Sequence, residues 1–239
     1  MKKQFLMIAT ATLLASPLFA QLLEINAKGS GKSTWILNKN ISDAGADQDS
    51  DLGWGYNYGG GLTFYFTKSL GVGADVMFNQ YNAAFKGTFG APLNFSYTSK
   101  ITLNTLDIPV MFKIKGEESG GFLELGAQYS MFNSINYHSS IGGINSDRDV
   151  KDKFTSSGIE GLLGLGLNID LNDRLVIQAG LRFEYGLTDI KGVDGLGRNL
   201  SDNLMYPLVY SKYQPSHLAA AGFFLGMAYS IGHITKSPG

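Results

Sequence analysis

The chain contains no cysteine, so neither a disulfide framework nor a thiolate metal site can be part of it. Histidine occurs three times, at dispersed positions that give no metal-ligand spacing. Charged residues make up only 16% of the chain and the net charge is −1, which excludes the basic surface of a nucleic-acid-binding protein. The longest apolar run, LAAAGFFLGMAYSIG, is short for a helix that crosses a bilayer. We therefore expect no cofactor, no metal and no nucleic acid.

The first twenty residues, MKKQFLMIATATLLASPLFA, have the build of a secretory signal peptide. Lys2 and Lys3 form its positive start, an apolar segment follows, and small residues precede a cleavage site after Ala20. We predict a signal peptide over 1–20 and one domain over 21–239. Removal of the signal leaves 17 basic against 20 acidic side chains, and export separates the chain from cytoplasmic nucleotides.

One short motif, AKGSGKST at 27–34, contains the Gly-Lys-Ser of a phosphate-binding loop. The full motif would need a glycine where Asn26 stands, and a helix should follow it, but the next residues have no helical period. Alternate residues of the same stretch form two faces, one of small or apolar residues and one of polar residues that includes Lys28 and Lys32. We predict a strand here and no nucleotide site.

Glycine and aromatic residues are plentiful, with 31 glycines and 12% aromatics, which favours many short strands. A period-two alternation of apolar with polar or glycine residues recurs along the chain. Pro109 lies within one such segment and predicts a bulge or another irregularity there. The alternation predicts eight strands, near residues 23–37, 54–66, 70–81, 106–115, 123–131, 159–169, 175–185 and 219–230.

The connections alternate between long and short. Short turns are expected near 67–69, 116–120 and 171–174, and they separate long polar loops expected near 38–52, 84–98, 134–155 and 187–216. Outer-membrane barrels combine an even strand number with short periplasmic turns and long external loops. The sequence therefore predicts an all-β fold, an eight-stranded antiparallel up-and-down transmembrane β-barrel in the cell outer membrane, with both termini periplasmic.

The two faces of the strands differ in charge. A lumen filled by paired charges is predicted from the polar faces, which carry Lys28, Lys32, Asp75, Asp107, Glu124, Glu160, Arg182 and Glu184. An aromatic girdle facing lipid is predicted from residues near strand ends, namely Trp35, Trp54, Tyr56, Tyr129, Tyr185 and Tyr229. A soluble lipocalin-like barrel, with its apolar face inward, is the structural alternative.

Three segments resemble the PorT-like outer-membrane β-barrel proteins of Bacteroidetes: LDIPVMFKIK at 106–115, GGFLELGAQYS at 120–130 and the long run at 158–190. The resemblance implies the barrel architecture over most of the mature chain, while the family is poorly specific for function. Gly226, Tyr229 and Ile231 match the terminal assembly signal of such barrels, although the chain continues beyond it.

Candidate chemistry is sparse. His138-Ser139-Ser140 resembles the His-x-Ser of lipid A deacylases but is expected in a glycine- and serine-rich loop. Acidic residues at 43, 47, 49 and 51 could bind calcium but lack the full EF-hand pattern, so a solvated loop is expected. We expect no enzyme activity and a structural or binding role.

The partners we expect are outer-membrane lipid, the barrel-assembly machinery during insertion, and an extracellular or envelope protein bound through the long loops, particularly Gly186 to Ser216. A lipid A-modifying enzyme and a channel for small hydrophobic molecules stay open as alternatives.

Overall fold

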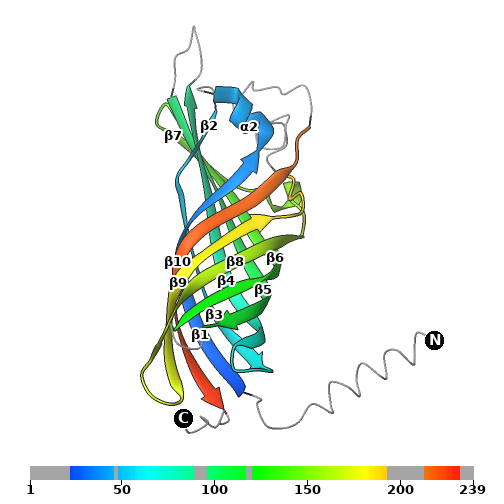
Figure 1. Cartoon of the computed structure of the whole chain (residues 1–239). Helices are drawn as coiled ribbons and strands as arrows, with labels where there is room; N and C mark the ends of the chain where they lie inside the picture. Colours follow the sequence, from blue (N-terminus) through cyan, green and yellow to red (C-terminus); the bar gives the residue numbers. More distant parts are fainter. Residues whose placement is uncertain (1–21, 46–47, 89–95, 117–119, 193–212, 232–239) are drawn as a thin grey trace, which may run out of the picture.

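This computed structural model describes residues 22–45, 48–88, 96–116, 120–192 and 213–231. Within these ranges, eight antiparallel strands pair into a closed ring (Figure 1). They are β1 (Leu22–Asn38), β3 (Gly53–Tyr65), β4 (Leu70–Thr88), β5 (Ser96–Lys115), β6 (Gly121–Ile141), β8 (Ser157–Asp170), β9 (Leu175–Gly186) and β10 (Ser216–Ile231). The predicted all-β, eight-stranded up-and-down barrel is confirmed. The predicted signal peptide lies outside the described residues.

The ring closes where β1 pairs with both β3 and β10. The β1–β10 ladder runs without interruption from Leu23 opposite Ile231 to Asn38 opposite Ser216. The stretch GSGKST therefore lies in the middle of β1, as predicted, and is extended rather than wrapped around a ligand.

Tight turns join the strands at the end of the barrel where β10 finishes (Figure 1). At 66–69 and at 171–174 the chain reverses through backbone hydrogen bonds, from the Phe66 amide to the Leu70 carbonyl and from the Leu171 amide to the Leu175 carbonyl. These two turns agree with the prediction. The third predicted turn, near 116–120, includes residues outside the described ranges.

The opposite end departs from the prediction. Loops were expected over 84–98 and 134–155, but β4 continues to Thr88, β5 begins at Ser96, and β6 continues into a hairpin with β7 (Ile144–Asp149). Helix α2 (Lys39–Ala44), strand β2 (Asp49–Asp51) and the 3-10 turn η2 (Lys151–Lys153) lie at the same end (Figure 1). The prediction of loops was wrong because these strands continue with a different pattern of side chains. We call this region, residues 39–45, 48–51, 81–88, 96–104 and 133–154, the extension.

Helix α2 is short and caps its own start. The Asn38 side chain accepts a hydrogen bond from the Asn40 amide, which satisfies one of the free N–H groups of the first turn. Ile41 is the buried residue of the helix. None of the helices in the described ranges is long and apolar enough to cross a membrane.

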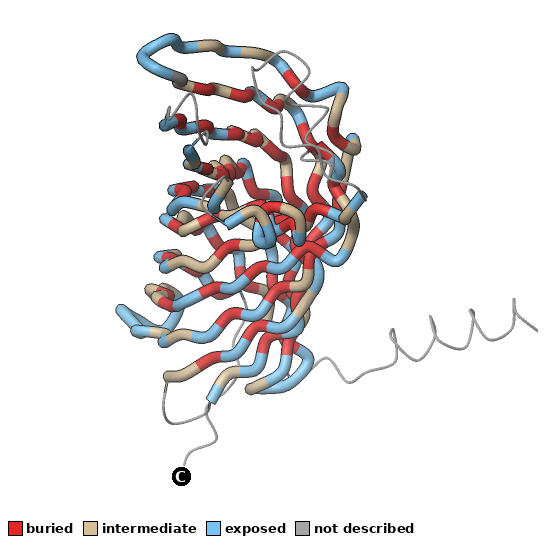
Figure 2. Tube along the Cα trace, turned by 90° about the horizontal axis from the view of Figure 1, so that it is seen from above, coloured by how far each residue is buried: buried red, intermediate tan, exposed pale blue. Residues whose placement is uncertain are grey.

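Burial alternates along every barrel strand (Figure 2). In the barrel below the extension, the exposed positions are apolar, for example Leu165, Phe112 and Leu125. Many of the buried positions are polar or glycine, with apolar exceptions such as Met111 and Phe224. A soluble barrel would hide its apolar face, so the lipocalin-like alternative is wrong.

In the extension the polarity is reversed. Phe85, Ile101 and Leu103 point inward and are at most 3% exposed, whereas Lys86 and Lys100 point outward. The switch occurs along single strands without any change in their direction. The extension therefore has a water-facing exterior and an apolar core of its own.

Two irregularities interrupt the ladders. On the β5–β6 side the register shifts between Asn104 and Thr105, because Asn133 is an extra residue in β6. On the β4–β5 side the paired positions pass from Ala74–Val110 to Met77–Asp107, which leaves a gap at Pro109. Proline has no N–H to donate, so the irregularity predicted at Pro109 is present as a gap, while the bulge lies elsewhere.

Candidate functional site

The interior of the barrel holds many buried charged side chains. The alternation of the strands points eight predicted residues inward, and each is at most 5% exposed: Lys28, Lys32, Asp75, Asp107, Glu124, Glu160, Arg182 and Glu184. Burying a charge costs free energy unless it is paired, so the contacts inside decide whether this arrangement is stable.

A lower cluster surrounds Glu124 on β6. Its carboxylate accepts a hydrogen bond from Arg182 Nη2 at 2.5 Å and lies 3.2 Å from Lys113 Nζ and 4.0 Å from Lys28 Nζ. Lys28 Nζ lies 2.8 Å from Asp75 Oδ2. Three cations thus share two carboxylates, and Glu124 holds strands β1, β5, β6 and β9 together across the lumen.

A further ion pair lies toward the turn end of the lumen. Lys115 donates a hydrogen bond to the Glu24 carboxylate, and its Nζ sits 4.1 Å from the centre of the Tyr65 ring. Glu24 and Tyr65 are each 1% exposed. The contacts fill the interior at this level with paired side chains.

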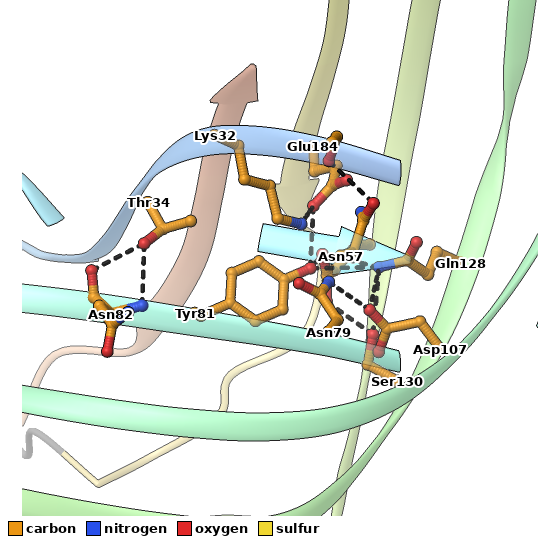
Figure 3. A network of polar contacts seen from close by, with 12 residues as sticks. Lys32, Thr34, Asn57, Asn79, Tyr81, Asn82, Asp107, Gln128, Ser130 and Glu184 are labelled. Carbon is orange, nitrogen blue, oxygen red and sulfur yellow. Dashed lines mark hydrogen bonds and ion pairs between the residues drawn. The ribbon is translucent and has the colours of Figure 1, made fainter. Parts of the chain in front are cut away.

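A second group of polar contacts, the upper cluster, joins Lys32, Tyr81 and Glu184 with Gln128 and Asp107 (Figure 3). Lys32 Nζ donates to Glu184 at 2.6 Å, and the Tyr81 hydroxyl lies 2.9 Å from both Glu184 and Glu160. Gln128 donates to Glu160 at 3.3 Å and to Asp107 at 3.2 Å. The amide and hydroxyl groups therefore join three carboxylates to a single lysine.

Several members of these clusters were not among the predicted lumenal residues. They are Glu24, Tyr65, Asn79, Tyr81, Lys113, Lys115, Gln128 and Ser130. All of these except Tyr65 lie on strands from which other inward residues were chosen. Their position in the alternation was a usable signal, because it places charged residues such as Lys113 and uncharged ones such as Gln128 on the same inward faces.

Above the upper cluster, an apolar core fills the interior. It brings together residues of the strands with residues from α2 and the upper connections: Ile36, Ile41, Tyr81, Ala83, Phe85, Ile101, Leu103, Phe132, Ile135, Tyr137, Val150, Phe154, Ile190, Leu218 and Ala220. Ile41 and Ile190 are each 2% exposed. We call this group the upper core; it lies over the charged lumen and fills the end of the barrel that faces the extension.

All six residues of the predicted girdle point away from the lumen. Trp54 is 65% exposed, and Tyr56, Tyr129, Tyr185 and Tyr229 are also exposed, while Trp35 is partly covered. Trp35 and Tyr185 flank the same residue of β10, Ala219. Tyr229 lies near the other end of that strand. The structure therefore gathers five of the six on the side of the extension.

His138 lies in β6, not in the loop that was expected. Its Nδ1 is 2.7 Å from Asp147 Oδ1 on β7, and the next residue, Ser139, is buried on the opposite face. Ser140 follows two positions along an extended strand, roughly 6.6 Å away. The described geometry thus pairs the histidine with a carboxylate and not with a serine. His217 is the second residue of β10, where it stacks on Tyr185, and His233 lies outside the described residues.

The acidic segment near α2 is divided among separate pairs. Asp43 pairs with Lys39 within α2, and Asp51 on β2 pairs with Lys86 on β4. Asp47 lies outside the described residues. In the described ranges, no group of three or more histidine, cysteine or acidic residues is arranged to hold a metal ion.

An exposed apolar belt around a charged, closed ring defines an integral β-barrel of the membrane. A family model described as "Outer membrane protein beta-barrel domain" matches residues 19–192, and the chain belongs to this family. It is an outer-membrane protein. Among curated proteins, none matches the chain.

Solved structures of similar architecture are outer-membrane barrels. Neisserial surface protein A is 12% identical, with 87% of this chain and 97% of that chain covered and a TM-score of 0.39. Ail of Yersinia pestis is 16% identical, with coverages of 87% and 98% and a TM-score of 0.35. OprG of Pseudomonas aeruginosa is 15% identical, with coverages of 90% and 97% and a TM-score of 0.40. Similarity at this level carries no argument about function.

Proposed function

We propose that this protein is a closed, non-catalytic barrel that anchors the extension outside the outer membrane as a binding platform. The observation that carries the proposal is the filling of the barrel by paired charges and then by the upper core. An eight-stranded barrel is just wide enough for side chains to fill. Such an interior offers no continuous path for water or solutes.

The extension supports the binding role. Long strands on the side away from the short turns are typical of the external side of outer-membrane barrels. Its strands are hydrogen-bonded and its core is buried, so it presents a rigid surface at little entropic cost on binding. The partner we propose is an extracellular or envelope protein; lipid and the assembly machinery are contacts required by the fold itself. Most of the segment 187–216, proposed from sequence as a further binding loop, lies outside the described residues.

The resemblance to PorT-like barrels supports the barrel architecture, and we propose membership of that group. The aromatic residues gathered near the extension support a girdle at the outer interface, where tyrosine and tryptophan place a polar edge in water and a ring in lipid.

Conductance and capture together test the proposal. The purified barrel in planar bilayers is expected to give no steady ion conductance, and so is the variant His138→Ala. A barrel from which the β6–β7 hairpin tip is removed, by joining Tyr137 to Arg148, is expected to insert normally and to lose a protein cross-linked to intact cells. Steady conductance of the unmodified barrel, or unchanged cross-linking by the shortened one, would contradict the proposal.

A further inference from the structure

The outer wall of the barrel has a pocket at the level where its surface changes from apolar to polar. Its volume is about 170 Å³, and the side chains around it include Tyr56, Tyr58, Phe78, Gln80, Asn104 and Asn133. Pockets for drug-sized ligands measure roughly 300–1,000 Å³, so this one accommodates a single ring-sized group. It lies on the outer wall of the barrel, and two residues whose side chains point inward, Asn79 and Thr105, also contribute to its lining.

Strand register explains why aromatic and amide groups meet here. One row of outward residues runs across four strands as Tyr56, Gln80, Asn104 and Ser134. The row beneath it is Tyr58, Phe78, Leu106 and Met131. The pocket therefore lies on the line between the polar exterior of the extension and the apolar belt.

The polar row is ordered by its own hydrogen bonds. Gln80 Nε2 donates to Asn104 Oδ1 at 3.0 Å, and Asn104 Nδ2 donates to Ser134 Oγ at 2.9 Å. Each amide nitrogen carries two hydrogens, so Gln80 and Asn104 each keep one donor for a ligand. The row thus presents fixed donors without needing to be reorganised.

The aromatic row forms the floor of the pocket. The rings of Tyr58 and Phe78 stack with centroids 5.6 Å apart, and these side chains are 57% and 52% exposed. Exposed, stacked aromatic rings next to amides suit the apolar face of a sugar ring together with its hydroxyl groups. Lipid chains alone would not use the amides.

The β6 bulge supplies the third side of the pocket and brings a positive charge to it. Asn133 is the extra residue in β6 and its side chain is exposed. Bulges re-aim side chains in this way. Lys151 Nζ donates to the Asn133 carbonyl at 2.8 Å, so an ammonium group lies beside one of the residues that line the pocket. A headgroup that carries a phosphate on a sugar matches this charge.

We propose that this pocket binds the phosphorylated sugar headgroup of a membrane glycolipid, whose acyl chains lie on the apolar belt below. The occupant is a lipid and not a free saccharide, because the pocket is continuous with the lipid-facing surface through Phe78 and Leu106. The barrel holds this lipid as a bound neighbour and does no chemistry on it. This inference is independent of the protein partner proposed for the extension.

The test uses the full-length mature barrel in nanodiscs of phosphatidylethanolamine to which lipid A is added as the probe. Native mass spectrometry after mild removal of the disc counts the lipids retained by each barrel. The unmodified protein is expected to retain lipid A in preference to phosphatidylethanolamine. Tyr58→Ala is expected to weaken that retention about tenfold, as loss of one stacked ring should, while Tyr58→Phe keeps the ring and the retention.

Matched controls lie outside the pocket. Tyr185→Ala removes an equally exposed tyrosine from β9, and Asn136→Ala removes an exposed amide above the bulge. Both are expected to retain lipid A normally, whereas Asn104→Ala is expected to lose it even if Tyr58→Ala fails to fold. Folding of each variant is checked by its heat-dependent mobility in a detergent gel.

Three results would overturn the proposal. The first is equal retention of lipid A and phosphatidylethanolamine by the unmodified barrel. The second is an equal loss in the pocket variants and in their controls. The third is competition by the phosphorylated disaccharide without acyl chains as strongly as by intact lipid A, because the occupant would then be a soluble sugar.

Discussion

The barrel and the extension are made from the same strands, yet they use them in opposite ways. In β4 the inward residue Asp75 pairs with a lysine and the outward residue Val76 faces lipid. Ten residues later Phe85 is inward and Lys86 outward. The strand keeps its direction and its alternation throughout, and only the polarity of the two faces is exchanged. The surrounding solvent, lipid or water, thus decides which face of one continuous strand is apolar.

The two regions also hold together by different forces. In lipid the hydrophobic effect gives no reason to fill the interior with apolar groups, so charges and hydrogen bonds connect the strands across the lumen. In water the extension depends on burial of apolar side chains. Substitutions that test one force should therefore leave the other region largely intact.

The largest effect is expected at the centre of the lower cluster. Glu124→Ala removes the carboxylate that Arg182, Lys113 and Lys28 share. Loss of one partner of a buried ion pair lowers the free energy of unfolding by about 3–5 kcal/mol. Denaturant unfolding in detergent micelles should show this loss. The exposed pair of Lys39 and Asp43 is the control, since Lys39→Ala should cost about 0–1 kcal/mol. Equal losses in the two variants would refute the assignment of the lumen as the main electrostatic support.

A somewhat smaller effect is expected in the upper core. Leu103 is fully buried, so Leu103→Ala should leave a cavity and cost about 2–5 kcal/mol. Hydrogen exchange should accelerate in 96–104 and leave β8 and β9 protected, because the loss belongs to the extension. Leu165→Ala on the lipid face is the control: lipid chains fill the space, so exchange in the extension should not change. Faster exchange in β8 and β9 of Leu103→Ala would show that the stability of the barrel depends on the core of the extension.

A third prediction concerns the junction between the regions. Tyr81 belongs to the upper core through its ring and to the upper cluster through its hydroxyl. Tyr81→Phe keeps the packing and removes the hydroxyl between Glu160 and Glu184, which should cost about 1–3 kcal/mol in denaturant unfolding. Tyr58→Phe, on the exposed outer wall, should change stability by less than about 0.5 kcal/mol. A neutral Tyr81→Phe would mean that the hydroxyl adds nothing to the cluster.

The smallest effect on stability is expected when the pH is lowered, through Asp189, which accepts a hydrogen bond from the amide of Ser216 at the start of β10. Partial burial acts to raise the pKa of Asp189, but hydrogen bonds from the Tyr213 hydroxyl and from the Ser216 and Lys191 amides outweigh it and lower the pKa. The stabilisation is therefore present above the unfolded pKa, about 3.9, and is lost as the pH falls through the lower folded value.

Exchange of the Ser216 amide measures this loss, after correction for the intrinsic effect of pH. Exchange should accelerate at acid pH in the unmodified barrel, whereas Asp189→Asn should remove that step. A step that persists in Asp189→Asn would assign it to another group.

The sequence predicts the barrel well because the alternation of β1, β8 and β9 is clear and their turns are short. It also predicts which charges point inward, since direction follows from parity alone. The partners are harder to predict: Lys28 contacts both Asp75 and Glu124, and such contacts depend on strand register and on how the ring closes. A sequence does not state either of these directly.

The extension was missed for a physical reason. Segments such as YNAAFK in β4 and SKITLN in β5 alternate like the rest, but they do so with the opposite faces polar. A search for one constant apolar face interprets that exchange as the end of the strand. The bulge at Asn133 was missed for a related reason, since it shifts the parity of β6 with no proline or glycine to mark it.

The ladder between β1 and β10 has a consequence for assembly. It joins the first and last strands of the ring through 16 paired positions, so these contacts span most of the chain. Contacts between distant positions carry the largest loop-closure cost and form slowly. Until β10 is in place, β1 presents an open edge of unpaired N–H and C=O groups, which can pair with other chains.

At Gly222 a side chain would collide with Lys32 in the closed ring, because its Cβ would lie 2.3 Å from the Lys32 Cβ. The last strand therefore needs glycine at position 222 to pair closely with β1. Before β10 pairs, the edge of β1 is exposed, and in this period the folding barrel needs protection from pairing with other chains.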